Sequence, residues 1–372
     1  LVHLVAIGWL SLAMAGALLQ FVPVLVSRPL AFSGLALPAL FALIAGLILL
    51  CAGFATLAGW IEAPLDLLPL GAAFLLSGFA LLGLMLAATL LSARPIALFA
   101  RFVLIGLACL AATALSGAAF TTLLSGRGDW LGAVALLPAG LPFHALLGLA
   151  GWLGLIAVGV SYRLFVMFMM APEPPIHRVR PVLLIASLGL GFAFVGLAAP
   201  FAAIEPGAGW ITAALAMLAL TCLFYSRDIL ALYRARRRKA LEINMLASIP
   251  AFIALGLGAT LLPVAILVQA GGGLIAAPVF LIIFGWLGGL TLAQLVKIVS
   301  FVTWLETYAP RLGRGPAPRV GDLVAMPRTG WWFLLYYAGV ALGTAALAIE
   351  ASGGFRTAAT LCLAGTAGLI VE

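Results

Sequence analysis

The stretch HALLGLAGWLGLIAVGVSYR, residues 144–163, carries the tripeptide Gly-Trp-Leu inside a long apolar run. The same tripeptide recurs at residues 8–10 and 285–287. In each copy a small residue follows the Trp after seven positions and a long polar residue after eleven. These shared offsets predict one kind of helix used three times. The small residues are Gly16, Gly159 and Ala293, and the polar residues are Gln20, Arg163 and Lys297.

The composition around these copies is that of a membrane protein. Hydrophobic residues make up 65% of the chain and charged residues 8%, with a mean hydropathy of +1.28. A soluble domain carries roughly 25% charged residues, so this chain has too few polar side chains to cover a surface in water. A β-barrel would need short alternating segments, which the continuous apolar runs are not. We therefore predict an all-α polytopic protein in contact with the lipid bilayer.

Eleven apolar runs are long enough to cross ~30 Å of hydrocarbon as helices. The segments between them contain Pro, Gly or charged residues, and no separate soluble domain is visible. Residues 1–372 are therefore predicted to form a single transmembrane domain. The predicted spans are about 1–26, 35–57, 66–92, 96–124, 141–170, 181–204, 208–233, 240–270, 273–308, 329–350 and 355–372.

Charge alternates between successive predicted loops. The basic set includes the run from Arg234 to Lys239, whereas the opposite set holds Glu62 and Asp66. The positive-inside rule places the basic loops in the cytoplasm and the protein in the inner membrane, so the net charge of +8 reflects topology and not nucleic-acid binding. The first span then runs inward, and we expect one further helix before Leu1, twelve in all. Three opposite loops carry tryptophans that fit an interfacial belt, Trp60, Trp130 and Trp210.

The Gly-Trp-Leu helices are the first, fifth and ninth predicted spans, and all three run in the same direction. This recurrence predicts three four-helix blocks with pseudo-threefold symmetry about an axis along the membrane normal. Their bounds are about 1–130, 131–270 and 271–372. The inverted repeats of many transporters would need an odd number of spans per block. The alternative is chance recurrence of the tripeptide in a chain rich in Gly and Leu.

Two histidines are candidate metal ligands. His3 and His144 each precede the Trp of a Gly-Trp-Leu helix, by six and eight positions, which predicts similar depths near the outer membrane surface. A neutral imidazole there could ligate haem iron or copper, or could simply form a hydrogen bond at a wet interface. The third histidine, His177, lies in a basic loop and is predicted to be solvated.

The polar residues at the shared position, Gln20, Arg163 and Lys297, allow two interpretations. Arg163 and Lys297 lie late in their helices, so their side chains are predicted to reach the inner membrane surface. Alternatively, they face the helix bundle, where they would bind an anion such as a haem propionate, relay protons or line a transport path. No carboxylate stands out at mid-membrane, and no phosphate-binding loop, zinc cluster or hydrolase motif occurs.

The chain resembles the catalytic subunits of haem-copper oxidases and nitric oxide reductases, and the smaller haem-copper proteins of the nitric oxide response. The resemblance rests on the helical plan and on two segments, from His3-Leu4 to Gln20-Phe21-Val22-Pro23-Val24 and from His144 to Gly159-Val160-Ser161-Tyr162-Arg163-Leu164. It implies twelve spans in three arcs, with metal sites toward the outer half of the membrane. His3 would take the place of a low-spin haem ligand, and His144 would stand near a copper-ligand position.

The chain departs from this family in its ligand set. The family's His-His pair has no counterpart between Pro181 and Ala203, and its two haem-ligating histidines have none between Phe280 and Ala309. The tyrosine found four residues after the copper ligand in many oxidases is Gly148 here. The resemblance therefore implies a degenerate, non-catalytic relative that binds one haem or no metal. Alternatives are a transporter or channel for a small or lipidic substrate, and a structural partner of other subunits in a respiratory or photosynthetic complex.

Overall fold

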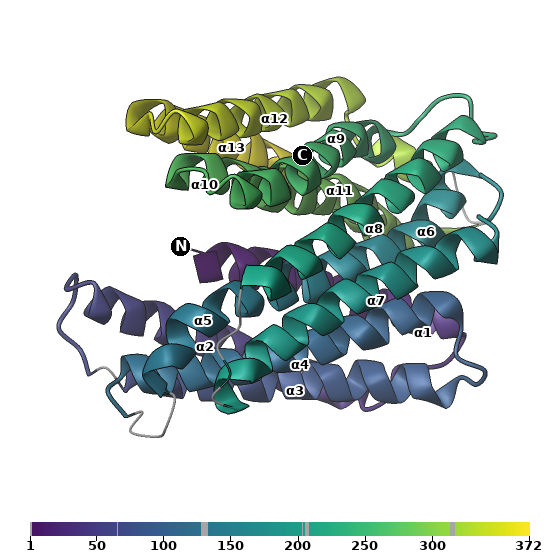
Figure 1. Ribbon diagram of the computed structural model, residues 1–372. Coiled ribbons are helices and arrows are strands. Elements are labelled where there is room, and N and C mark those ends of the chain that lie inside the picture. The colour runs from purple at the N-terminus through teal and green to yellow at the C-terminus, as the bar shows by residue number, and fades with distance from the viewer. Residues whose placement is uncertain (1, 65, 128–132, 203, 205–207, 313–316) are drawn as a thin grey trace. The chain divides into compact units, whose positions relative to one another are not determined.

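The computed structural model describes the chain except residues 1, 65, 128–132, 203, 205–207 and 313–316. All regular structure in the described residues is helical (Figure 1). Eleven of these described helices are long and apolar enough to cross a membrane. The predicted helical polytopic class is therefore confirmed. Trp130 lies outside the described residues.

Two compact units make up the fold, Leu1–Tyr162 with Ile176–Thr221, and Arg163–Pro175 with Cys222–Glu372. The helices that begin in the first unit are η1 Leu4–Ser11, α1 Leu12–Val26, η2 Ser33–Leu35, α2 Ala36–Leu57, α3 Leu67–Ser92, α4 Leu98–Leu124, α5 Ala133–Leu146, η3 Leu147–Leu155, α6 Ile156–Met169, α7 Ile176–Ala198, η4 Ala199–Ala202 and α8 Ala208–Arg234. The second unit holds the ends of α6 and α8, with α9 Ile243–Leu267, α10 Gly272–Phe280, η5 Leu281–Gly288, α11 Gly289–Thr307, η6 Ala309–Arg311, η7 Val320–Leu323, α12 Met326–Ala348 and α13 Ser352–Val371.

Two predicted spans have the wrong bounds. The span predicted at 141–170 begins earlier, at Ala133, because α5 continues through Pro138 and Pro142. The span predicted at 181–204 is α7, which begins at Ile176 and ends at Ala198. Both helices continue through prolines, Pro138 and Pro142 in α5 and Pro181 in α7. Membrane helices also tolerate proline when neighbouring groups satisfy the backbone.

Glycines allow the helices of the first unit to pack closely. Helix α2 lies along α3, and α3 lies along α4 (Figure 1). A Cβ added at Gly46 of α2 would lie 2.7 Å from the backbone N of Leu75, and one added at Gly71 of α3 would lie 2.6 Å from that of Leu50. Small residues bring helix backbones together in membranes, where packing, more than a hydrophobic driving force, holds helices to each other.

In the second unit, glycines bring the backbones of α12 and α13 together in the same way. A Cβ added at Gly365 of α13 would lie 2.8 Å from the backbone N of Tyr336, and one added at Gly339 of α12 would lie 2.8 Å from the carbonyl O of Ala358. The two helices run side by side as a hairpin (Figure 1). Their backbones touch with no room for a methyl group at either glycine.

Each of the three Gly-Trp-Leu copies lies in a π-helical segment. The segments are η1 Leu4–Ser11, η3 Leu147–Leu155 and η5 Leu281–Gly288. A π-helix accounts for well under 1% of residues in proteins and is often found at functional sites. In each case an α-helix follows the π-helical segment without a break, so one long helix changes from π-helical to α-helical geometry.

Replacing Gly365 with Ala should destabilise the α12–α13 hairpin by about 1–3 kcal/mol, because the new methyl group would meet backbone and not a movable side chain. Thermal unfolding of the purified protein in detergent micelles measures the change. Gly353→Ala is the matched control, since a Cβ there has open space around it in the same helix. Equal melting temperatures for the two variants would contradict the close packing.

Candidate functional site

The ring of His144 lies within hydrogen-bonding distance of a hydroxyl group on a neighbouring helix. Its Nδ1 lies 3.0 Å from the Oγ of Ser116 on α4. The Ser116 hydroxyl donates its only proton to the carbonyl O of Thr113, at 3.1 Å. With that proton on the carbonyl, the Oγ accepts from Nδ1–H, and in the neutral ring Nε2 keeps its lone pair. This is the arrangement in which an imidazole binds a metal through Nε2 while its other nitrogen is oriented by a partner.

Aromatic and small residues surround the His144 ring. The ring of Phe120 lies 5.4 Å away between centroids, tilted by 59°. A Cβ added at Gly117 would lie 3.2 Å from the ring Cε1 of His144. Ser116, Gly117 and Phe120 all belong to α4, so this one helix contacts the imidazole on several sides, and a side chain at Gly117 would crowd the ring.

His3 lies in the same unit, as the residue that precedes η1. Its ring stacks on Phe54 of α2, with 5.3 Å between centroids and an angle of 18° between the planes. The segments that follow the two histidines, η1 and η3, are in contact. Both imidazoles are half-buried and belong to the first unit. His177, by contrast, is exposed near the start of α7.

The metal ligands of the family that the chain resembles are missing from the sequence, and the described residues do not assemble a substitute set. Among the residues that the structure describes, no three His, Cys, Asp or Glu side chains gather where they could hold a metal ion. The axial ligation of a single haem iron needs one or two nitrogen ligands, and the first unit contains two imidazoles, those of His3 and His144. They do not fit a copper centre held by three histidines.

Two of the π-helical segments are joined by a buried hydrogen bond. The indole Nε1 of Trp152 in η3 donates to the Oγ of Ser11 in η1, at 2.9 Å. Ser11 in turn donates to the carbonyl O of Ala6, five residues earlier, at 2.7 Å. Both Trp152 and Ser11 are almost fully buried. The bond therefore joins the helix that follows His3 to the helix that contains His144, at a point eight residues after each histidine.

The third π-helical segment has different polar contacts. The hydroxyl of Tyr336 on α12 donates to the carbonyl O of Phe284 in η5, at 2.6 Å. Trp286 is buried, and its indole Nε1 has no hydrogen-bond partner among the described residues. The Trp of the third Gly-Trp-Leu copy thus lacks the hydrogen bond to serine that the Trp of the second copy forms. The third copy also has no histidine shortly before its Trp.

The three polar residues at the shared position have different surroundings. Gln20 is exposed on α1. Arg163 forms an ion pair with Glu173, which lies in the segment between α6 and α7. The Nζ of Lys297 lies 2.6 Å from Glu242 Oε2, at the start of α9. Both cations are therefore paired with carboxylates at or beyond helix ends, as expected of side chains that reach the membrane surface.

A buried polar cluster that the sequence analysis did not single out lies next to Lys297. Asn244 Nδ2 donates to Gln294 Oε1 at 3.3 Å, and Gln294 Nε2 donates to Ser248 Oγ at 3.0 Å. Asn244 and Ser248 are fully buried, and Asn244 Oδ1 has no partner among the described residues. The signal was present, because Asn244 and Ser248 stand four residues apart in an apolar helix and so share one face.

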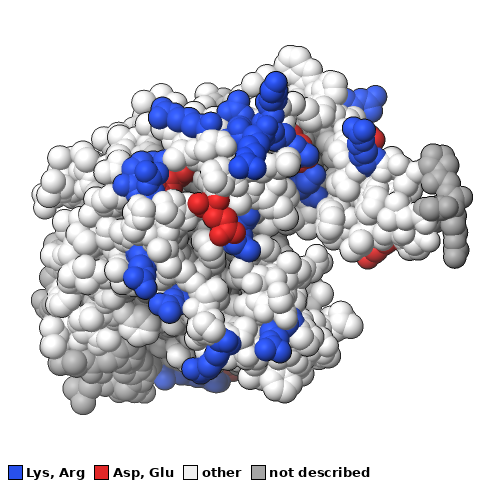
Figure 2. Space-filling view, turned by 90° about the vertical axis from the view of Figure 1, so that its right-hand side faces the viewer, with Lys and Arg blue, Asp and Glu red and all other residues white. Residues whose placement is uncertain are grey.

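Basic side chains gather at the helix ends. Lys and Arg side chains are spread over the face shown in Figure 2, with few Asp and Glu side chains among them. One group is organised around Glu242, which pairs with both Arg238 and Lys297.

Comparison with known proteins assigns no family to the chain, since no protein-family model and no curated protein matches it.

Replacing Ser11 with Ala should destabilise the protein by about 1–3 kcal/mol, because the buried indole N–H of Trp152 would lose its acceptor. Ser77→Ala is the control, as that hydroxyl bonds only within its own helix at an exposed position. Thermal unfolding in micelles measures both. The double variant with Trp152→Phe should be less destabilised than the sum of the single changes, and strict additivity would argue against the bond.

Proposed function

We propose that the chain is a haem-binding integral membrane protein of oxidase-like plan that lacks the copper centre and does not itself reduce oxygen or nitric oxide. His144 is the proposed ligand through Nε2, and His3 offers the second imidazole. The observation that carries the proposal is the 3.0 Å contact between His144 Nδ1 and Ser116 Oγ, which, with the Ser116 proton on the carbonyl of Thr113, leaves the lone pair of Nε2 free. A bound haem would supply one-electron transfer, as expected of a subunit associated with a respiratory membrane.

The π-helical segments support the repeat on which this plan depends. Chance recurrence of Gly-Trp-Leu would not by itself bring the same rare backbone geometry to all three copies. We propose that η1, η3 and η5 are equivalent parts of three blocks, with bounds near 1–130, 131–270 and 271–372. Only the first two blocks carry a histidine before the Trp, so one ligand site and not three is proposed.

The residues of the first unit have distinct roles in this proposal. Ser116 holds the ring of His144 in one tautomer and one orientation. Phe120 and Phe54 cover the two imidazoles and limit the access of water. The Trp152–Ser11 bond fixes the two histidine-bearing helices against each other, so that the spacing of the imidazoles is set by the fold.

The transport alternative draws on Arg163 and Lys297, and their ion pairs favour a role as anchors at the membrane surface. A residue that lined a path for a substrate would be expected to face the bundle without a fixed carboxylate partner. Replacing each with Met separates the two interpretations, because anchors tolerate the change and path residues do not.

Haem binding is tested by the pyridine haemochrome assay on folded protein purified from haem-replete cells. We expect about one haem per chain in the wild type, a near-complete loss in His144→Gln, and a reduced content or altered spectrum in His3→Gln. The control is His177→Gln, because that side chain is exposed and should leave the haem content unchanged. A folded wild-type protein without haem would overturn the proposal.

Orientation is a second expectation, with the basic loops in the cytoplasm. In a variant without native cysteines, Arg236→Cys should react with a membrane-impermeant maleimide in inside-out vesicles only. Trp60→Cys, in the opposite loop, should react in right-side-out vesicles only. The reverse pattern would show that the basic loops face outward.

A further inference from the structure

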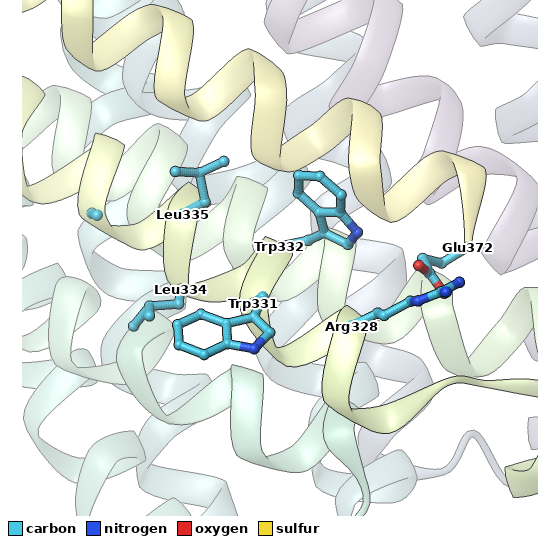
Figure 3. A pocket seen from close by; sticks show the side chains of 7 residues that line it. Arg328, Trp331, Trp332, Leu334, Leu335 and Glu372 are labelled. Atoms are coloured by element: carbon cyan, nitrogen blue, oxygen red, sulfur yellow. The ribbon is translucent and has the colours of Figure 1, made fainter.

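An open groove of about 670 Å³ lies along α12 at the end where α13 finishes (Figure 3). Its lining includes two tryptophans, two leucines, one arginine and one glutamate. Its size is within the range of small-molecule sites, roughly 300–1,000 Å³. The side chains used below are Arg328, Trp331, Trp332, Leu334, Leu335 and Glu372.

The apolar part of the groove faces outward from the hairpin. Trp331 is 69% exposed and Leu334 is 59% exposed. Trp332 packs directly on the backbone of α13, because a Cβ at Gly368 would overlap its ring. The floor is therefore fixed by the helix pair, while the outer wall presents large apolar side chains to the hydrocarbon.

The polar part of the groove is confined to one end and carries both charges. Arg328 lies in the first turn of α12, and Glu372 directly follows α13. Their side chains point toward one another in Figure 3. They are the only charged residues of the lining. A cation and an anion on one rim complement a ligand whose own head carries both signs.

The length of the groove matches one leaflet of a bilayer. From Arg328 to Ala338, the lining extends over ten residues of helix, or about 15 Å. That is half of the ~30 Å hydrocarbon thickness. Tryptophan and arginine at the polar end are the side chains expected at the level of lipid headgroups.

We propose that this groove binds one phospholipid with a zwitterionic headgroup that ends in a primary ammonium, the phosphatidylethanolamine class. Arg328 binds the phosphate through its guanidinium, and Glu372 accepts hydrogen bonds from the ammonium. One acyl chain lies along Trp331, Leu334 and Leu335. A quaternary ammonium has no N–H to donate to Glu372. An anionic headgroup without an amine cannot form a favourable contact with the Glu372 carboxylate.

Native mass spectrometry of the full chain tests this proposal. The protein is equilibrated in vesicles of equal parts phosphatidylethanolamine, phosphatidylcholine and phosphatidylglycerol, extracted into mild detergent, and examined for retained lipid. We expect one phosphatidylethanolamine per chain in preference to the other two. Arg328→Gln and Glu372→Gln should each lower its retention roughly tenfold, since each removes a charge-assisted hydrogen bond.

Arg356→Gln is the matched control, because Arg356 is an exposed arginine near the opposite end of α13 and outside the groove. It should retain the lipid as the wild type does. Equal retention of all three lipids, a preference for phosphatidylglycerol, or a dimer that excludes lipid from the wild type would each overturn the proposal. So would unchanged retention in Arg328→Gln and Glu372→Gln.

Discussion

Hydrocarbon offers no hydrogen-bond partners, and this constraint governs the polar chemistry of the chain. A buried polar group in a span must find its partner within the protein. The indole of Trp152 finds Ser11, and the imidazole of His144 finds Ser116. Both contacts lie in the first unit and both use a serine, whose small hydroxyl can accept one bond and donate another. Two serines therefore hold the region that contains both candidate ligands.

The same constraint explains where the charges lie. The carboxylate of Glu242 is shared between Arg238 and Lys297 at the start of α9, and Arg163 pairs with Glu173 after the end of α6. A cluster of neutral polar side chains, Asn244, Ser248 and Gln294, lies further along α9 and α11. The carboxylates of these ion pairs thus lie at or beyond helix ends, where headgroups and water reduce the cost of burying charge.

The class of fold could be predicted from the sequence, because the length of an apolar run decides whether that segment can span a bilayer. Hydropathy located eleven spans and most of their bounds, but it placed the starts of two spans, at 141 and 181, after the true starts at Ala133 and Ile176. It could not predict the π-helical geometry of the three copies, which depends on backbone hydrogen bonds shifted by one residue and not on composition. The pairing of His144 with Ser116 was equally hidden, since it joins side chains of different helices.

The central claim is that Ser116 keeps the proton of His144 on Nδ1 and leaves Nε2 free to bind a metal. Solid-state NMR of ¹⁵N-histidine-labelled protein in lipid bilayers, before any haem is added, reports the protonation of each ring nitrogen directly. The His144 signals are assigned by their loss in His144→Gln. We predict a protonated Nδ1 and an unprotonated Nε2, and a shift toward mixed tautomers in Ser116→Ala. A proton on Nε2 of the wild-type ring would contradict the account.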